Sequence, residues 1–394
     1  MKRKICIFTG TRAEYGLLKP LIDELRTDNS VELQIVISGM HLSPEFGLTY
    51  REINLDGFSK VEKVEILLSS DTPVGISKAM GLGMISYAEA LDRLKPDLLV
   101  GLGDRFELFS AVSAALVSRI PVAHIHGGEV TLGAYDDAFR HSITKMSHLH
   151  FASTEIYRKR IIQLGENPKT VFNVGALGLD NIKKMKLLSK KELENSLNFF
   201  LDKPYFVVTF HPVTLEKNTS EKQFKELLKA LDEFKSYKFI FTKANADNDG
   251  RIINNLIDEY VAKNKDRAAS FYSLGQLRYL SALKYAEMMI GNSSSGIVEM
   301  PFFKKPTINI GDRQNGRIFP KSVIQCKPNQ KSIIGAVERG LDDKFRKSIN
   351  QTKSIYGNGT ASKKIKKVIT TTELTKLIKK EFHDIKRFNQ SNIP

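Results

Sequence analysis

Short apolar runs alternate with longer amphipathic segments along most of the chain. Because neighbouring parallel strands need a crossover helix, this alternation predicts an α/β protein whose parallel sheets carry helices on both faces. The strands are expected at KICIFTG, LQIVISG, DLLVGLG, PVAHIHGG, HLHFAST and TVFNVGA in the first half, and at YFVVTFHP, KFIFTKA, ASFYSLG, AEMMIGNS and PTINIGD in the second. The helices are expected near 17–27, 78–94, 105–118, 220–235, 250–263, 276–285 and 331–342.

Two successive sets of about six strands predict two Rossmann-like, doubly wound domains with a cleft between them. The polar stretch 178–203 ends in a proline and marks the expected boundary. We therefore expect an N-terminal domain over 1–180 and a C-terminal domain over 181–365. A basic amphipathic helical segment should follow over 366–394.

Composition narrows the class of protein. The chain has 394 residues, a net charge of +16 and two cysteines, Cys6 and Cys326, both in expected strands. Two buried thiols suit a reducing cytoplasm, and no apolar run has the length of a membrane span. The lysines are spread along the chain without the aromatic interleaving of a nucleic-acid site, so we expect neither nucleic acid nor membrane as a partner.

Ligands of open α/β sheets bind beyond the carboxyl ends of the strands. The charged and polar residues of interest lie in the turns that follow the expected strands. The first turn, GTRAEYG, has Arg12 and Glu14 where a dinucleotide fold has glycine, with Lys19 one helical turn later. The turn GDRFE offers Asp104 and Arg105, although a lone aspartate there is usually a helix cap.

The segment from HIHGGE to DDAFRH is the densest in titratable groups. It contains His124, His126, Glu129, Asp136, Asp137, Arg140 and His141. On a strand the two histidines of H-x-H share a face, which would suit zinc. No recognised zinc spacing accompanies them, so a proton-transfer cluster is favoured over a metal site.

The second half places polar groups at equivalent turns. His211 ends one expected strand, and Lys243, Asn245 and Asp247 follow another. In GNSSSGIVE a strand runs into three serines that begin a helix, an arrangement that binds phosphate oxygens. Glu299 follows one turn later, where its carboxylate could accept both ribose hydroxyls, and Arg313 adds positive charge. A plain serine cap is the simpler alternative.

Together the two halves predict a site for a nucleotide sugar. The chain resembles a known family, the UDP-N-acetylglucosamine 2-epimerases. The similarity is to the hydrolysing branch, which begins the synthesis of sialic and related nonulosonic acids. The resemblance rests on GTRAEYG, GMH, GDRFE, HIHGGE, DDAFRHSITKMSHLHF, FHPVT, GNSSSGIVEMP and INIGDRQNGR, in family order. It implies a glycosyltransferase-B fold, with the C-terminal helix crossing back to the first domain, and an assembly of two or four copies.

The resemblance also implies roles for individual residues. The expected catalytic residues are Asp104, His126, Glu129, Asp136 and His211. The expected UDP- and substrate-binding residues are Arg12, Lys19, His41, Arg105, Arg140, His141, Asn245, Ser293, Ser294, Ser295, Gly296, Glu299 and Arg313. Many relatives have a glutamate where this chain has His126. Either His126 or Glu129 would therefore take the proton-transfer role of that glutamate.

The implied reaction eliminates UDP from UDP-N-acetylglucosamine to give 2-acetamidoglucal, and water then adds with inversion at C2 to release N-acetylmannosamine. No metal or redox cofactor is required. The main alternative substrate is UDP-N,N'-diacetylbacillosamine, on the way to legionaminic acid. A non-hydrolysing epimerase, a glycosyltransferase and a nucleotide-sugar sensor are the remaining readings of the same site, and either product would feed a capsule or another surface polysaccharide.

Overall fold

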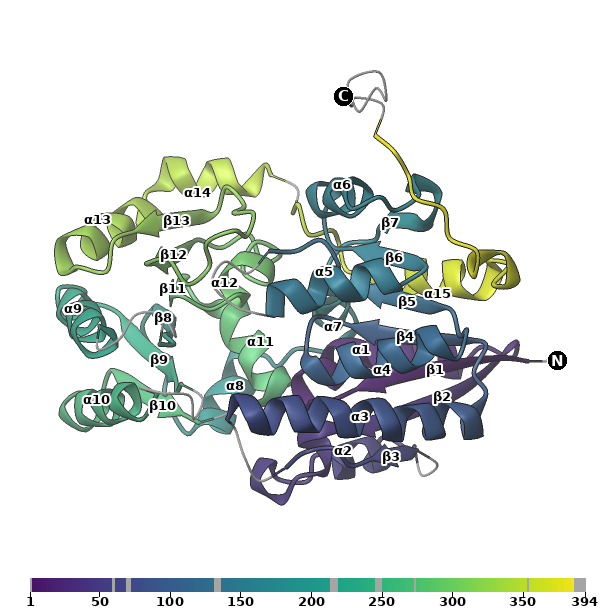
Figure 1. Cartoon of the computed structure of the whole chain (residues 1–394). Helices are drawn as coiled ribbons and strands as arrows, with labels where there is room; N and C mark the ends of the chain where they lie inside the picture. The colour runs from purple at the N-terminus through teal and green to yellow at the C-terminus, as the bar shows by residue number, and fades with distance from the viewer. Residues whose placement is uncertain are drawn as a thin grey trace. The chain divides into compact units, whose positions relative to one another are not determined.

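The computed structural model describes residues 2–58, 61–68, 72–130, 136–212, 219–244, 250–272, 274–352 and 354–385. The described chain divides into two compact units. Unit 1 holds the residues up to Asn181 and those from Tyr356 onward, and unit 2 holds Ile182 to Ile355. Each unit is a parallel sheet with helices packed on it (Figure 1).

Unit 1 contains a seven-stranded parallel sheet with the order β3-β2-β1-β4-β5-β6-β7 among its described residues. The strands are β1 (Arg3–Thr9), β2 (Val31–Ser38), β3 (Glu62–Val64), β4 (Leu98–Leu102), β5 (Val122–Ile125), β6 (Leu149–Ala152) and β7 (Val171–Asn173). The helices are α1 (Arg12–Arg26), α2 (Tyr50–Leu55), α3 (Pro73–Leu94), α4 (Phe106–Val117), α5 (Asp136–Met146), α6 (Glu155–Gln163) and α15 (Ala361–Thr371). Short 3-10 turns are η1 (Gly39–Leu42), η2 (Pro44–Phe46), η3 (Pro168–Thr170) and η4 (Thr375–Leu377).

The continuous apolar runs of these strands are explained by burial on both faces. In β1, Ile5 and Ile7 join the core formed with α1 and α15, whereas Cys6 and Phe8 join the core formed with α3 and α4. A strand that alternated apolar and polar residues could fill only one of these cores. The doubly wound prediction for this half of the chain is therefore confirmed.

Unit 2 repeats the plan with six parallel strands in the order β10-β9-β8-β11-β12-β13 among its described residues. The strands are β8 (Tyr205–Thr209), β9 (Lys238–Thr242), β10 (Ala268–Phe271), β11 (Met288–Gly291), β12 (Thr307–Ile310) and β13 (Val323–Cys326). The helices are α8 (Lys190–Leu197), α9 (Ser220–Asp232), α10 (Gly250–Lys263), α11 (Gly275–Tyr285), α12 (Ser295–Val298), α13 (Gln330–Leu341) and α14 (Asp343–Asn350), and α7 (Gly178–Lys184) lies where the chain passes from unit 1 to unit 2.

The C-terminal segment differs from the expected helix. α15 begins at Ala361, where the carboxylate of Asp180 accepts its first backbone N–H at 2.9 Å, and it ends at Thr371. The hydroxyls of Thr371 and Thr372 donate to carbonyls of the preceding turn, and β-branched residues weaken helix propagation. Beyond α15 the described chain, which reaches residue 385, contains only the 3-10 turn η4, so the expected helix over 366–394 is wrong in this part. Among the described helices, none combines the length and hydropathy needed to cross a bilayer.

Candidate functional site

Each sheet has one point where the strand order reverses, between β1 and β4 in unit 1 and between β8 and β11 in unit 2. Open α/β sheets bind their ligands outside the carboxyl ends of the strands at this point. The residues that directly follow these four strands are therefore the first candidates for a site. Most of the sequence-predicted residues lie there or on the turn after β5.

In unit 1 the centre of the candidate site is an ion pair between Asp104, just after β4, and Arg140 of α5. The Arg140 side chain is buried, and its second terminal nitrogen donates to the carbonyl of His126 at 3.0 Å. Asp136 lies at the start of the same helix, and burial raises its pKa, with the charge of Asp104 adding to the rise. The structure thus brings Asp104, Asp136 and Arg140 together from two separate stretches of sequence.

A second ion pair lies at the same edge of the sheet. The guanidinium of Arg105 binds the carboxylate of Glu107 through two hydrogen bonds of 2.7 and 3.1 Å, and the Glu107 side chain is fully buried. Glu14, near Arg105, accepts the backbone N–H of Gly10 at 2.8 Å. Burial raises the pKa of Glu14 to about 7, although the Gly10 bond and Arg105 oppose the rise. A carboxyl group with this pKa could exchange protons near neutral pH.

The turn after β5 corrects one sequence expectation. The strand ends at Ile125, and His126 has a φ of 65°, in the left-handed region. The expectation that His124 and His126 share one face is therefore wrong, because the chain has already left the strand at His126. The ring of His126 instead lies 3.4 Å from the carboxylate of Glu129, which also accepts the hydroxyl of Ser153 at 2.9 Å. In the described part of the chain, no group of three His, Cys, Asp or Glu side chains could hold a metal ion.

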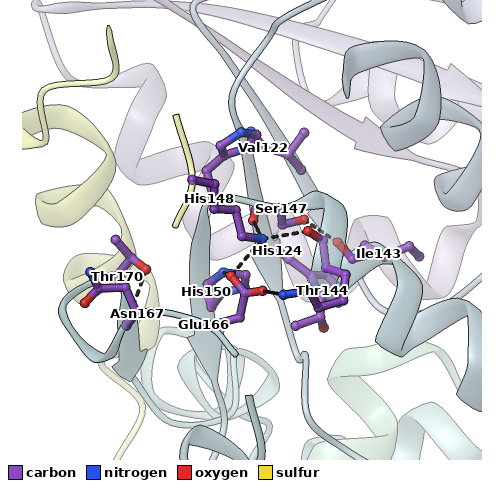
Figure 2. A network of polar contacts seen from close by, with 12 residues as sticks. Val122, His124, Ile143, Thr144, Ser147, His148, His150, Glu166, Asn167 and Thr170 are labelled. Atoms are coloured by element: carbon purple, nitrogen blue, oxygen red, sulfur yellow. Dashed lines mark hydrogen bonds and ion pairs between the residues drawn. The ribbon is translucent and has the colours of Figure 1, made fainter. Parts of the chain in front are cut away.

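His124 of β5 is not among the residues that the sequence predicts for the site. Figure 2 shows it beside Thr144, in a region of buried polar contacts that also contains His148, just before β6, and His150 of β6. Its Nε2 lies 2.7 Å from the carbonyl oxygen of Gly103, the residue before Asp104. Nearby, His150 binds the buried carboxylate of Glu166 at 2.9 Å.

Four predicted binding residues of unit 1 have partners outside the Asp104 pair. Arg12 is exposed and lies 3.7 Å from Glu52. Lys19 pairs with Asp23 and Asp56 at 3.2 and 3.3 Å. His41 is buried between the hydroxyls of Thr9 and Thr49, and burial lowers its pKa to about 4. His141 lies 3.4 Å from Asp137. Their roles in binding remain predictions.

In unit 2 the turns after β8 and β11 are joined by the side chain of Asn292. Its amide accepts the backbone N–H of His211 and donates to the His211 carbonyl, both at 2.8 Å. A guanidinium nitrogen of Arg313 donates to the Asn292 carbonyl at 3.2 Å. The close approach also requires glycine at 291, where a Cβ would lie 1.8 Å from the Thr209 carbonyl oxygen. Burial lowers the pKa of His211 to about 4, and Arg313 adds to the decrease.

The three serines follow directly. Ser293 and Ser294 precede α12, which begins at Ser295 as expected but contains only four residues. A helix this short has a small dipole, so the hydroxyls and backbone N–H groups of the turn carry the case for binding an anion. Gly296 lies against Thr307, whose side chain a Cβ would meet at 2.4 Å.

Two further side chains accompany the serine turn. Burial raises the pKa of Glu299 to about 7, with Ser295 and Arg317 acting against the rise. Tyr279 of α11 is a residue that sequence reasoning missed. Burial raises its pKa, and the hydroxyls of Ser295 and Ser293 interact with its phenol group. Asn245, the remaining predicted residue, lies outside the described residues.

Two doubly wound units with polar and charged side chains at both reversal points define the glycosyltransferase-B class of fold. Comparison with solved structures agrees: the UDP-GlcNAc 2-epimerase from Neisseria meningitidis, determined with UDP-GlcNAc bound, superposes with a TM-score of 0.81 at 20% identity, covering 94% of this chain and 100% of that one.

Sequence comparison identifies the family. The profile of the UDP-N-acetylglucosamine 2-epimerase family matches residues 23–370. The chain is 51% identical over 328 residues to the GDP/UDP-N,N'-diacetylbacillosamine 2-epimerase (hydrolyzing) of Campylobacter jejuni, covering 83% of this chain and 85% of that protein. It is 40% identical over 355 residues to the polysialic acid biosynthesis protein P7 of Escherichia coli, covering 90% of each. A UDP-N,N'-diacetylbacillosamine 2-epimerase (hydrolyzing) of Legionella pneumophila is 33% identical, covering 95% of this chain and 97% of that protein. The chain belongs to the UDP-N-acetylglucosamine 2-epimerase family, and the resemblance inferred from its motifs is confirmed.

Proposed function

We propose that the protein hydrolyses UDP-N,N'-diacetylbacillosamine with inversion at C2, releasing UDP and the free manno-configured diacetamido sugar. The observation that supports this substrate is the 51% identity to a relative named for it, together with the 33% identity to a second. UDP-N-acetylglucosamine, which the sequence motifs placed first, is the second candidate. A relative from Neisseria meningitidis named UDP-N-acetylglucosamine 2-epimerase, 32% identical over 339 residues, favours it.

The reaction consists of an elimination followed by a hydration. A base removes the proton from C2 while the C1–O bond breaks, and the electron pair of that bond leaves with UDP. A C1=C2 double bond remains. Water then adds its oxygen to C1, and an acid delivers a proton to C2 on the opposite face. One water molecule is consumed, and the products are UDP and the free sugar.

We assign the proton transfers at C2 to unit 1. Asp104 is the proposed base, because Arg140 holds its carboxylate in one position through a partly buried ion pair. Asp136 is the proposed acid, because burial and the neighbouring Asp104 raise its pKa and so favour its protonated form. His126 and Glu129, which contact each other, would support these transfers.

We assign nucleotide binding to unit 2. The hydroxyls of Ser293, Ser294 and Ser295 would donate to the diphosphate, and Glu299 would accept hydrogen bonds from the ribose hydroxyls. His211 and Arg313 lie next to the same turn and would stabilise the charge that develops on the departing UDP.

The names of the relatives support a proposed place for the product in the cell. The match to a polysialic acid biosynthesis protein supports a role in making a sialic- or legionaminic-type acid for a capsule or other surface polysaccharide. The two cysteines, which are free thiols, suit a cytoplasmic enzyme. An assembly of two or four copies stays a prediction.

A substrate panel tests the proposal. The purified enzyme would be mixed separately with UDP-N,N'-diacetylbacillosamine, its GDP analogue and UDP-N-acetylglucosamine, and nucleotide and free sugar would be quantified together. We expect kcat/KM for the diacetylated UDP sugar to exceed that for UDP-N-acetylglucosamine at least about tenfold, the range one substituent can produce. A reversed preference would establish the second candidate. Release of nucleotide without a free sugar, or no turnover on any of the three, would refute both.

A further inference from the structure

A buried histidine, His124, contacts the turn formed by Gly103 and Asp104. His124 is fully buried at the end of β5, and burial lowers the pKa of its imidazole to about 3, so the ring is neutral. Its Nε2 lies 2.7 Å from the carbonyl oxygen of Gly103. Because a carbonyl oxygen can only accept, Nε2 carries the ring proton and Nδ1 is an acceptor.

The other side of the ring contacts α5. The hydroxyl of Thr144 donates to the carbonyl oxygen of Arg140 at 3.0 Å and lies 3.1 Å from Nδ1 of His124, so it links the ring to the backbone of Arg140. Space for the contact depends on glycine at 127, where a Cβ would lie 2.9 Å from the Thr144 hydroxyl and 3.0 Å from Nδ1. Thr144 follows Arg140 by one helical turn, and Arg140 is the partner of Asp104.

These contacts form a connected set of interactions around Asp104. The Gly103 peptide is held on both sides, since its N–H donates to the carbonyl of Ile125 at 3.0 Å and its carbonyl accepts from His124. Gly103 has a φ of 90°, a conformation in which glycine rotates easily once its hydrogen bonds are lost. The position of the Asp104 carboxylate therefore depends on His124 as well as on Arg140.

We propose that His124 is a positioning residue, which fixes Asp104 against Arg140 through the Gly103 carbonyl and Thr144. The proposal rests on the proposed function, in which Asp104 acts at C2. A misplacement of about 1 Å at a reacting group costs on the order of 100-fold in rate, which sets the effect expected from losing this contact.

Two substitutions at one position separate positioning from packing. In His124→Gln the side-chain amide can reach the place of Nε2 and donate to the Gly103 carbonyl. In His124→Asn the amide is shorter and reaches only the place of Nδ1. His148→Asn is the matched control: His148 is also buried, but its Nδ1 accepts the backbone N–H of Val122 at 3.1 Å, a bond that asparagine can replace.

The experiment measures kcat, KM, UDP affinity and thermal midpoint for all three variants. We expect His124→Asn to lower kcat about 100-fold with KM and UDP affinity within about threefold. His124→Gln should recover most of that loss, and His148→Asn should keep kcat within about threefold. A His124→Gln variant no better than His124→Asn, or an equal loss in His148→Asn, would overturn the proposal.

A second pair covers the case in which His124→Asn fails to fold. Thr144→Val removes the hydroxyl that links His124 to Arg140, whereas Thr144→Ser keeps it, and we expect a lower kcat only in the valine variant; equal kcat in both would overturn the proposal. Crystal structures give a readout independent of turnover. The Asp104–Arg140 pair should be displaced in His124→Asn, or in Thr144→Val, and retained in His124→Gln; an undisplaced pair would contradict positioning. Absence of turnover in the unmodified enzyme would instead refute the proposed function.

Discussion

The described strands of unit 2 follow the order of the first six strands of unit 1, but the two units place different chemistry at the point where that order reverses. In unit 1 the groups are charged and already paired, as in Asp104 with Arg140 and Glu107 with Arg105. In unit 2 they are mainly neutral donors, the serines and His211, whose buried Nδ1 has no hydrogen-bond partner among the described residues. Paired charges fix the position of a group that must transfer a proton, whereas neutral donors suit a ligand that brings its own negative charge. The contrast supports a division between chemistry in unit 1 and nucleotide binding in unit 2.

The largest expected effect comes from unit 1. Asp104→Asn should lower kcat by about 10²- to 10⁴-fold, the usual contribution of a positioned base, because the amide cannot accept the C2 proton. Calorimetric titration should show UDP affinity within about threefold of the unmodified enzyme. Asp92→Asn, an exposed position on α3, is the control for loss of a carboxylate. Near-normal turnover in Asp104→Asn would contradict the assignment of the C2 proton transfer to Asp104 of unit 1.

A paired charge can also have a purely structural role. Glu166 is such a case, and it can be compared with the proposed catalytic pair of Asp104. Its buried carboxylate binds His150, Lys145 and Lys380 at 2.9, 2.6 and 2.7 Å (Figure 2 shows the His150 contact). Burial alone would raise its pKa, but these donors lower the pKa of Glu166 to about 2. Glu166→Ala should cost about 1–3 kcal/mol of stability, because the buried His150 and the more exposed Lys145 and Lys380 lose the carboxylate to which they donate.

Turnover at a permissive temperature should be unaffected by Glu166→Ala, since the ion pairs of Glu166 in the described chain are with His150, Lys145 and Lys380, whereas Asp104 pairs with Arg140. Thermal unfolding and kcat measured on the same preparation make the comparison. Glu221→Ala, which breaks an exposed pair with Lys225, should cost less than about 0.5 kcal/mol. A large loss of kcat in the folded Glu166 variant would mean that the two networks of unit 1 are not separate.

In unit 2 the corresponding change is Glu299→Ala. Loss of hydrogen bonds to a charged group should weaken UDP binding by about 10- to 100-fold, while kcat at saturating substrate changes little. Glu338→Ala, an exposed carboxylate of α13, serves as the control. If UDP affinity is unchanged in Glu299→Ala, the ribose contact is wrong; if kcat falls and affinity does not, the division between the units is wrong.

The smallest effect concerns pH and should be alike in both units. Burial lowers the pKa of His124 to about 3 and that of His211 to about 4, from an ordinary value of 6.5. Below pH 6.5 the unfolded histidines bind protons and the folded ones do not, so stability falls as the pH drops from 6.5 toward these values. Each histidine contributes up to about 1.4 kcal/mol per pH unit. Urea unfolding between pH 7 and 5 should show a shallower dependence in His124→Gln and in His211→Gln; an unchanged slope would mean that the ring in question is charged in the folded protein.

Much of the fold could be predicted because it depends on short-range patterns. The run at β1 is apolar at every position from Ile5 to Phe8, which identifies a strand buried on both faces. β3 was missed because its three residues, Glu62–Val64, include a single buried apolar side chain. The C-terminal helix was placed too late, because its amphipathic pattern continues past the threonines that end it at Thr371.

The sequence suggests candidate residues for the site but not the contacts between them. Asp104 and Arg140 are 36 residues apart, and only the order of β4, β5 and α5 brings them together. The left-handed backbone of His126 leaves no signal in a run that otherwise reads as strand. Tyr279 was missed because it lies on a helix that precedes the serine turn, and nothing in its own segment indicates a ligand.

The most direct test of the account follows the hydrogen on C2. The enzyme would be incubated in deuterated water with UDP-N,N'-diacetylbacillosamine, and the products examined by proton and carbon NMR. We expect UDP and a free manno-configured sugar with one deuterium at C2, and formation of this product at least about 100-fold slower with Asp104→Asn. A free sugar that keeps its original hydrogen at C2, or one of unchanged configuration, would contradict the account.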